Sequence, residues 1–444
     1  MLKAFKRSAK GARLPEEKPT ADLQTRTDFP VPAEVCLPMS MHIGAPAVPC
    51  VEKGQQVCVG TLIGQAGGFV SANIHSSVSG TVKEIRDFTD NGRTGKLVVI
   101  TTDGKQTPDP ELKPPVVTDK DSFLKAVRAS GLVGLGGAGF PTDVKFNPKN
   151  PDAVDTLLIN ASECEGYLTS DNREMIENTD DIVDGILAAM KYLNIPRCII
   201  GVEDNKPEAI KVLSEKTAQY SNITVDPLKC GYGIGSELLL IERCCGREVP
   251  HGKLPADAGV IVSNVSSIGF LGRYLKTGMP LVERRVTIEG DAVANACNVF
   301  IPVGTPIEKI VEYAGIKEGV QLAKIVSGGP MMGAAQAAVS GYLKKQNNGL
   351  GLLSKERATL PEANPCIRCG RCVDYCPIGL EPVEVAAAYN AKDFDRLGAL
   401  HADYCVNCGS CSYVCPATRP VTQTMNLAKG WYMTESKKRQ GGNK

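Results

Sequence analysis

The sequence predicts a multidomain protein in which α/β units and all-β units follow one another. At 444 residues, the chain is too long for a single hydrophobic core. Short apolar runs broken by glycine fill residues 31–85, and strand-like and helix-like runs alternate between residues 155 and 264. Near the C-terminus, a run of four cysteines occurs twice. We therefore expect roughly three to five domains of different architecture.

The composition is that of an ordinary globular protein, with 43% hydrophobic residues, 22% charged residues and a formal net charge of +1. This balance gives no reason to expect nucleic acid as a partner. No apolar run is long enough for a transmembrane segment, and no apolar stretch typical of a signal peptide follows the basic N-terminus. Of the 17 cysteines, those outside the two runs show no disulfide spacing. We therefore expect a reducing, cytoplasmic compartment.

The cysteine runs predict two [4Fe-4S] clusters. Each run has three cysteines separated by two residues, then a fourth that precedes a proline. The first run is Cys366, Cys369, Cys372 and Cys376, and the second is Cys405, Cys408, Cys411 and Cys415. In two-cluster ferredoxins the fourth cysteine ligates the other cluster, so Cys376 and Cys415 are predicted to cross over. The alternative is a zinc ribbon, which needs only pairs of cysteines.

The N-terminal part is predicted to be an arm, residues 1–28, followed by a small all-β unit, residues 29–107. The arm carries charge and little periodicity. The all-β unit resembles barrel-sandwich hybrid domains of the lipoyl and biotinyl type, which carry a cofactor on a lysine at a hairpin tip. The corresponding segment, 65–71, contains no lysine. We therefore expect a structural or docking module.

Residues 115–284 predict an α/β unit with a parallel sheet. A helix-like segment precedes the glycine-rich loop at 131–139, so the loop lacks the preceding strand that a dinucleotide fingerprint requires. Such a loop still lets backbone N–H groups approach a phosphate or a flat ring. The buried strand at 155–159 ends in the acidic segment 160–166. Ligands bind at this end of open α/β sheets, which predicts a binding site there.

The C-terminal part is predicted to contain two further units and a tail. Two strands, a helix and more strand predict a β-grasp unit over residues 285–345. The cysteine runs lie in a ferredoxin unit over residues 355–430, and the helix-compatible residues between the runs favour a helical architecture. Residues 431–444 are predicted to be a polar tail.

Three segments together, residues 131–145, 160–166 and 232–237, resemble the flavin subunit of respiratory complex I, where such segments hold FMN and NADH stacks on the flavin. The chain as a whole resembles the RnfC family. This resemblance covers "M-H-I-G-A-P-A-V-P", "G-L-G-G-A-G-F-P-T", "S-G-G-P-M-M-G" and both cysteine runs. It implies a barrel-sandwich hybrid, a Rossmann-like FMN/NADH-binding α/β domain, an SLBB-type β-grasp domain and a helical dicluster ferredoxin domain.

The resemblance also implies which residues bind FMN and NADH. Those that would cradle FMN are Gly134, Gly136, Gly137, Gly139 and Lys145. Phe140 would flank the nicotinamide or adenine ring. Those that would line the pocket are Asn160, Glu163, Glu165, Tyr232, Gly235 and Glu237. Those that would contact the flavin ribityl or phosphate are Asn264 and Ser267.

The implied function is an NADH-oxidising electron-transfer subunit that uses FMN and two [4Fe-4S] clusters. Its partners would be the iron–sulfur and membrane subunits of an Rnf ferredoxin:NAD+ oxidoreductase complex, with ferredoxin reached indirectly, at the cytoplasmic face of the membrane. Segments 11–15, 163–167 and 232–237 depart from the usual family pattern, which leaves open a soluble RnfC-like protein that feeds a cobalamin or proline reductase. A separate alternative is a flavin-less ferredoxin scaffold.

Overall fold

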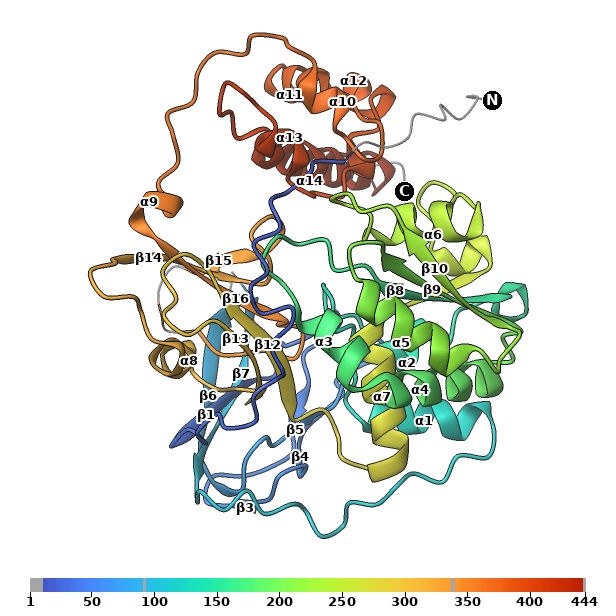
Figure 1. Cartoon of the computed structure of the whole chain (residues 1–444), viewed down its shortest axis with the longest axis vertical. Coiled ribbons are helices and arrows are strands. Elements are labelled where there is room, and N and C mark those ends of the chain that lie inside the picture. The colour runs from blue at the N-terminus through green and yellow to red at the C-terminus, as the bar shows by residue number, and fades with distance from the viewer. Residues whose placement is uncertain (1–10, 91–92, 337–338, 340, 442–444) are drawn as a thin grey trace.

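The computed structural model describes residues 11–90, 93–336, 339 and 341–441 (Figure 1). The remaining residues of the predicted arm (1–10) and tail (442–444) lie outside the described residues. Within the described ranges, the strands form four sheets. The ferredoxin unit lies at one end of the molecule and the N-terminal β unit at the other, with the α/β and β-grasp units between them (Figure 1). No helix in these ranges is long and apolar enough to cross a membrane.

The N-terminal unit is a barrel-sandwich of two small antiparallel sheets. One sheet has the order β1 (Glu34–Pro38), β7 (Arg93–Thr102), β6 (Gly80–Asp90), β3 (Gln56–Val57). The other has the order β2 (Val48–Pro49), β4 (Leu62–Gln65), β5 (Ile74–His75). Their inner faces bury Leu37, Ile63, Ile74 and Val98 in one core, because alternate residues of each strand face inward.

The α/β unit contains a four-stranded parallel sheet in the order β10 (Ile223–Leu228), β9 (Arg197–Glu203), β8 (Thr156–Ala161), β11 (Val260–Asn264). Its helices are α1 (Lys120–Ala129), α2 (Thr142–Lys145), α3 (Ser170–Glu177), α4 (Thr179–Leu193), α5 (Pro207–Thr217), α6 (Glu237–Cys245) and α7 (Val265–Thr277), with short 3-10 turns η1 (Pro151–Ala153) and η2 (Pro255–Ala258). The chain changes direction across the sheet between β8 and β11. Such a switch point is where open α/β sheets bind ligands.

Helices α4 and α7 pack closely because glycines lie at their contact. A Cβ on Gly185 would meet the backbone oxygen of Ile268 at 2.0 Å, and one on Gly272 would meet that of Asp181 at 2.0 Å. This close approach fixes α7, whose first residue directly follows β11 at the switch point.

The β-grasp unit has a mixed sheet in the order β13 (Cys297–Pro302), β12 (Glu283–Glu289), β16 (Gly349–Ser354), β14 (Leu322–Ser327), β15 (Ala334–Gln336), together with α8 (Ile307–Ala314). Strand β16 runs parallel to β12 and antiparallel to β14, so the last strand is central. The sheet therefore extends beyond 345, the boundary expected from the sequence. The predicted arm is not separate either, since Arg26 exchanges backbone hydrogen bonds with Asn298 and Phe300 along β13.

The ferredoxin unit is helical, and α9 (Lys355–Ala358) precedes it. Its elements are α10 (Arg371–Asp374), α11 (Pro382–Asn390), α12 (Phe394–Ala399), η3 (Ala402–Tyr404), α13 (Ser410–Tyr413) and α14 (Val421–Gly441). The described part of the predicted tail, 431–441, continues α14. This difference has a physical reason: Tyr432 stacks on Phe394, with ring centroids 4.8 Å apart, so the helix is anchored beyond residue 430.

Candidate functional site

A cavity of about 670 Å³ lies at the carboxyl end of the parallel sheet. All four units contribute to its walls: Phe88 from the barrel-sandwich, the α/β unit, the 327–348 segment of the β-grasp and Cys408 of the ferredoxin unit. Asn160 and Asn264, at the ends of β8 and β11, are register partners and both line it. The volume is within the usual range for a cofactor-sized ligand.

The first glycine loop forms one exposed wall of this cavity. A Cβ on Gly136 would meet Asn264 Nδ2 at 2.6 Å, whereas one on Gly137 would meet nothing within 4 Å. The backbone N–H of Leu135 donates to Ser267 Oγ at 2.9 Å and holds the loop against the start of α7. The loop thus presents bare backbone to the cavity, as a phosphate or flat ring requires.

Two buried carboxylates, Glu163 and Asp171, line the cavity near the start of α3. Glu163 accepts hydrogen bonds from the backbone N–H groups of Asp171 at 2.8 Å and Asn172 at 3.1 Å. Asp171 accepts one from Asn264 Nδ2 at 2.7 Å. Burial raises the pKa of both carboxyls; the charge of Asp171 raises that of Glu163 further, and the charge of Glu174 does the same for Asp171. Through its hydrogen bonds with the backbone N–H groups of Asp171 and Asn172, Glu163 also holds the N-terminus of α3 in place.

Glu165 connects the α/β unit to the β-grasp unit. Its carboxylate accepts hydrogen bonds from the backbone N–H groups of Met331 and Met332, each at 3.0 Å, and from Tyr232 Oη at 3.1 Å. Burial raises the pKa of Glu165 and of Tyr232. These contacts close the cavity between the two units.

The structure brings most of the expected flavin-site residues together. Those that line the cavity are Gly136, Gly137, Asn160, Glu163, Glu165, Tyr232, Gly235, Glu237 and Asn264. Those outside the lining are Gly134, Gly139, Phe140, Lys145 and Ser267. Lys145 Nζ instead pairs with Glu237 Oε1 at 3.0 Å, and Ser267 is buried in α7, where its hydroxyl holds the loop.

Sequence reasoning did not find the residues that the β-grasp unit contributes. Lining residues of this kind include Gly329, Met332, Gln346, Asn347 and Asn348. The "S-G-G-P-M-M-G" motif was a signal for the first two, but amides in a loop have no spacing that points to a ligand.

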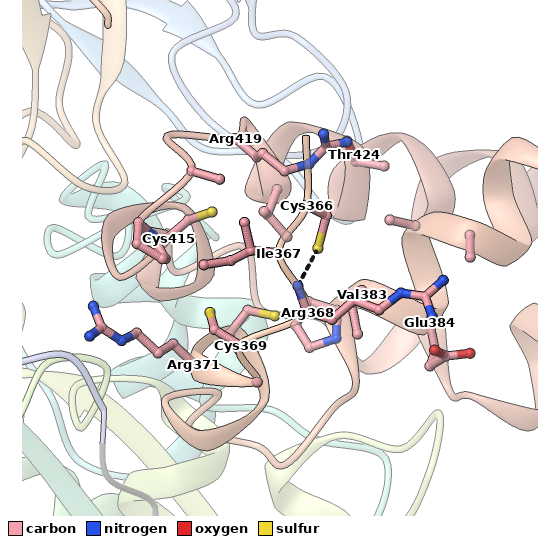
Figure 2. Close-up of a pocket in the computed structure, with 18 of the residues that line it drawn as sticks. Cys366, Ile367, Arg368, Cys369, Arg371, Val383, Glu384, Cys415, Arg419 and Thr424 are labelled. Atoms are coloured by element: carbon pink, nitrogen blue, oxygen red, sulfur yellow. Dashed lines mark hydrogen bonds between the residues drawn. The ribbon is translucent and has the colours of Figure 1, made fainter. Parts of the chain in front are cut away.

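Two further cavities, in the ferredoxin unit, are each lined by four cysteines. The first, of about 450 Å³, is lined by Cys366, Cys369, Cys372 and Cys415, and we call it the outer site. The second, of about 20 Å³, is lined by Cys376, Cys405, Cys408 and Cys411, and we call it the inner site. Figure 2 shows the thiols of Cys366, Cys369 and Cys415 around the outer site. This grouping is the crossed one that the run spacing predicts.

The donor sets fit a cubane better than a zinc ion. Among the described residues, no three His, Cys, Asp or Glu side chains are grouped as a single metal ion requires. A single zinc ion holds its sulfurs about 2.3 Å from one centre, whereas a cubane spreads four thiolates over four irons.

Both cysteine runs contain the same backbone turn. Arg368 and Asn407, each two residues after the first cysteine of its run, have left-handed backbones with φ of 53° and 54°. Such a conformation costs about 1–2 kcal/mol for a residue with a Cβ. In exchange, the N–H groups of Arg368 and Asn407 each donate to a cysteine sulfur, Cys366 and Cys405 respectively, at 3.4 Å. Both turns therefore aim backbone dipoles at thiolates, which stabilises a bound cluster.

The inner site adjoins the cavity at the carboxyl end of the parallel sheet, which we call the flavin cavity after the expected flavin-site residues that line it, whereas the outer site faces solvent. Cys408 lines both the inner site and the flavin cavity. Cys366 and Cys369 of the outer site are exposed. The three cavities thus form a series with one buried end and one exposed end.

Comparisons with known proteins match three parts of the chain to known domain families. Three family models match: the RnfC barrel sandwich hybrid domain at residues 6–105, the Nuo51 FMN-binding domain at 127–271 and the 4Fe-4S dicluster domain at 365–418. The chain is 40% identical over 411 residues to a subunit of the Na+-translocating ferredoxin:NAD+ oxidoreductase complex of Acetobacterium woodii, covering 92% of this chain and 93% of that one. The chain belongs to the RnfC family.

Two further members of the RnfC family show similar identity. The corresponding subunit of the proton-translocating ferredoxin:NAD+ oxidoreductase complex of Clostridium ljungdahlii is 39% identical, covering 80% of this chain and 78% of that one. That of the ion-translocating oxidoreductase complex of Rhodobacter capsulatus is 36% identical, covering 93% and 80%. The chain therefore combines a barrel-sandwich domain, an FMN-binding domain and a domain for two [4Fe-4S] clusters.

Proposed function

We propose that this chain is the NADH-oxidising subunit of an Rnf-type ferredoxin:NAD+ oxidoreductase, and that electrons pass from the flavin cavity through the inner site to the outer site. Membership of the RnfC family and the two cofactor-binding domains support the reaction. The order of the relay rests on one observation: Cys408 lines both the inner site and the flavin cavity.

In this proposal the cofactors supply the redox chemistry, because FMN accepts a hydride and releases single electrons that iron–sulfur clusters carry. The protein positions and shields them. Gly136 and Gly137 leave room for the flavin beside Asn264. Glu165 holds the β-grasp loop over the cavity through the backbone of Met331 and Met332. The shared wall at Cys408 keeps the flavin next to the first electron acceptor.

The test is anaerobic reduction of the reconstituted protein by NADH, followed by its visible and EPR spectra. We expect bleaching of the flavin followed by reduction of both clusters, whereas a flavin-less scaffold would bind no FMN and oxidise no NADH. A protein whose clusters are reduced by dithionite but not by NADH after FMN is added would contradict the proposal.

We further propose that the chain lies at the cytoplasmic face of a membrane, bound to the other subunits of an Rnf complex and reaching ferredoxin through them. The relatives are named as subunits of ion-translocating complexes, which supports this assignment. Affinity purification from detergent-solubilised membranes tests it. Recovery of soluble reductases alone would favour the RnfC-like paralogue instead.

A further inference from the structure

The β-grasp unit presents a closed turn, residues 344–347, to the flavin cavity. The backbone N–H of Asn347 donates to Lys344 O at 3.1 Å, and the backbone N–H of Lys344 donates to Asn347 Oδ1 at 2.7 Å. Strand β16 begins at Gly349, so the turn leads directly into the central strand of the sheet. The protein itself therefore fixes the backbone of this turn.

Two buried side chains join the turn to the glycine loop of the α/β unit. Lys345 Nζ donates to Gly131 O at 2.7 Å, at the start of the loop. Arg284, in the neighbouring strand β12, donates from Nε to Asn347 O at 3.2 Å and from Nη2 to Leu135 O at 3.3 Å. The turn and the loop are thus held together as one preorganised wall of the cavity.

On this wall, Gln346 has a side-chain amide that the protein does not satisfy. Its Oε1 atom is buried and accepts no hydrogen bond from the described residues. Gln346 lines the flavin cavity, and a Cβ on Gly139 would meet both Cβ and Cδ of Gln346 at 3.6 Å, so the amide lies against the end of the glycine loop. Buried acceptors without a donor are rare in folded proteins, because the hydrogen bonds lost to water are not replaced. A donor on a bound ligand would satisfy this one.

Two other amides on the cavity wall differ from Gln346, because the protein engages both of their polar atoms. Asn160 donates from Nδ2 to Gly235 O at 2.9 Å and accepts at Oδ1 from the backbone N–H of Ser162 at 3.1 Å. Asn264 likewise has one acceptor partner and one donor partner. These two amides hold the wall together, whereas Gln346 keeps its hydrogen-bonding capacity for the cavity.

We propose that Gln346 recognises the planar amide edge of a ring bound in the flavin cavity. Its Oε1 accepts a hydrogen bond from an N–H of the ring edge, and its Nε2 donates to the carbonyl oxygen beside that N–H, since a primary amide carries an acceptor and donors in one plane. The isoalloxazine imide of FMN and the nicotinamide carboxamide of NADH both carry such an edge. The assignment rests on the proposed function where the ring is nicotinamide. Gln346 is then a specificity-determining residue that the β-grasp unit contributes.

The test compares Gln346→Met with Gln106→Met in the full-length chain with both clusters reconstituted. Methionine keeps the unbranched shape of glutamine and removes both polar atoms of the amide. Gln106 is the matched control, because its Oε1 is also buried and accepts no hydrogen bond from the described residues. It follows β7 in the chain and is not among the described residues that line the flavin cavity.

Three quantities are measured: the dissociation constant of FMN by calorimetry, the reduction potential of bound FMN, and the preference for NADH over its 3-acetylpyridine analogue. The analogue carries a methyl group in place of the carboxamide NH2, and the preference is the ratio of the two kcat/KM values. If Gln346 pairs with the flavin, Gln346→Met should weaken FMN binding about tenfold and shift the potential, with the ratio unchanged. If it pairs with nicotinamide, FMN affinity should stay and the ratio should fall about tenfold. Gln106→Met should match the wild type in all three.

Wild-type values of all three quantities in Gln346→Met would overturn the proposal and show that water satisfies the amide. An equal loss in Gln106→Met would also overturn it, because the loss would then come from general destabilisation. The thermal midpoint of the FMN-free chain checks this directly, and we expect Gln346→Met not to lower it. Failure of the proposed function is distinguishable: if NADH reduces nothing in the wild type, FMN affinity and potential still decide whether Gln346 recognises the flavin.

Discussion

The two cysteine runs have the same spacing and the same backbone turn, yet they lie in opposite environments. In the outer site, Cys366 and Cys369 are exposed and the cavity measures about 450 Å³. In the inner site, Cys405 is buried and the space between the thiols is about 20 Å³. The spacing determines the ligands of each cluster, while the surrounding units determine what each cluster exchanges electrons with. Under the proposed function, this difference sets the order in which electrons pass through the two sites.

The largest effect is expected from replacing Cys376 or Cys415, the cysteines that each line the site formed mainly by the other run. Cys376→Ala belongs to the first run, but we expect it to abolish the inner cluster, since Cys376 lines that site. NADH should then reduce the flavin but no longer reduce the outer cluster. Cys415→Ala should remove the outer cluster and leave the inner one reducible by NADH. EPR spectra and iron content distinguish the two, and loss of the outer cluster alone in Cys376→Ala would refute the crossed grouping.

A buried lysine anchors the start of the glycine loop that lines the flavin cavity. Lys345 is fully buried, and its ammonium donates to the backbone oxygens of Asn73 and, at 2.7 Å, Gly131, at the start of the glycine loop. Burial lowers the pKa of Lys345 from 10.5 to about 7. The unfolded chain therefore binds more protons than the folded chain between those values, so stability rises with pH in that window. The slope is up to about 1.4 kcal/mol per pH unit.

The measurement is the thermal midpoint of flavin release between pH 7 and 10. We expect Lys345→Met to flatten the rise, and Lys53→Met, at an exposed position, to retain it. His75 lies beside this lysine, and burial lowers its pKa to about 3, so it stays neutral throughout. An equal slope in Lys345→Met and the wild type would show that the ammonium is not the group that titrates.

A matched pair of glycines separates packing from flavin binding at the inner end. In Gly136→Ala the added Cβ meets Asn264 Nδ2 at 2.6 Å, and Asn264 caps α7, so we expect a loss of stability of about 1–3 kcal/mol together with weaker FMN binding. In Gly137→Ala the added Cβ meets no protein atom within 4 Å, so stability should not change. Because Gly137 lines the flavin cavity, only FMN affinity should fall. Neither should change the dithionite-reduced spectrum of the outer cluster. Calorimetry with FMN measures both, and normal FMN affinity in Gly137→Ala would place the flavin elsewhere.

How much the sequence predicts differs between the two ends of the relay. The cluster ligands follow from spacing, because each run forms a local turn that needs few long-range contacts. The flavin cavity depends on four units that meet only in the folded chain. Resemblance places Lys145 and Phe140 near the flavin, but a residue's position in a motif does not fix where its side chain points. Lys145 ends the short helix α2 and pairs with Glu237 rather than lining the cavity.

The smallest expected effect concerns the contact that joins the inner run to the flavin unit. His251 Nε2 lies 2.6 Å from Asp403 Oδ2, and its ring stacks on Tyr404 with centroids 4.4 Å apart. Because His251 is largely exposed, we expect His251→Ala to change stability by about 0–1 kcal/mol. Asp403 and Tyr404 directly precede Cys405, so the variant should slow electron transfer from the reduced flavin to the inner cluster without slowing flavin reduction by NADH.

Stopped-flow spectroscopy separates these two steps, and His251→Phe is the control because it keeps the ring stack and loses the hydrogen bond to Asp403. An intermediate rate in His251→Phe would divide the positioning effect between the ring stack and the hydrogen bond. If His251→Ala transfers electrons to the inner cluster as fast as the wild type, the remaining contacts, among them those of Pro377 with Gly233 and of Met331 with Gly409, are sufficient to hold the ferredoxin unit in place. The position of the inner site would then rest on such contacts, including the turn at Pro377, the proline that follows the fourth cysteine of the first run. The outer site has the equivalent turn at Pro416. The two runs would then differ only in the units that cover them.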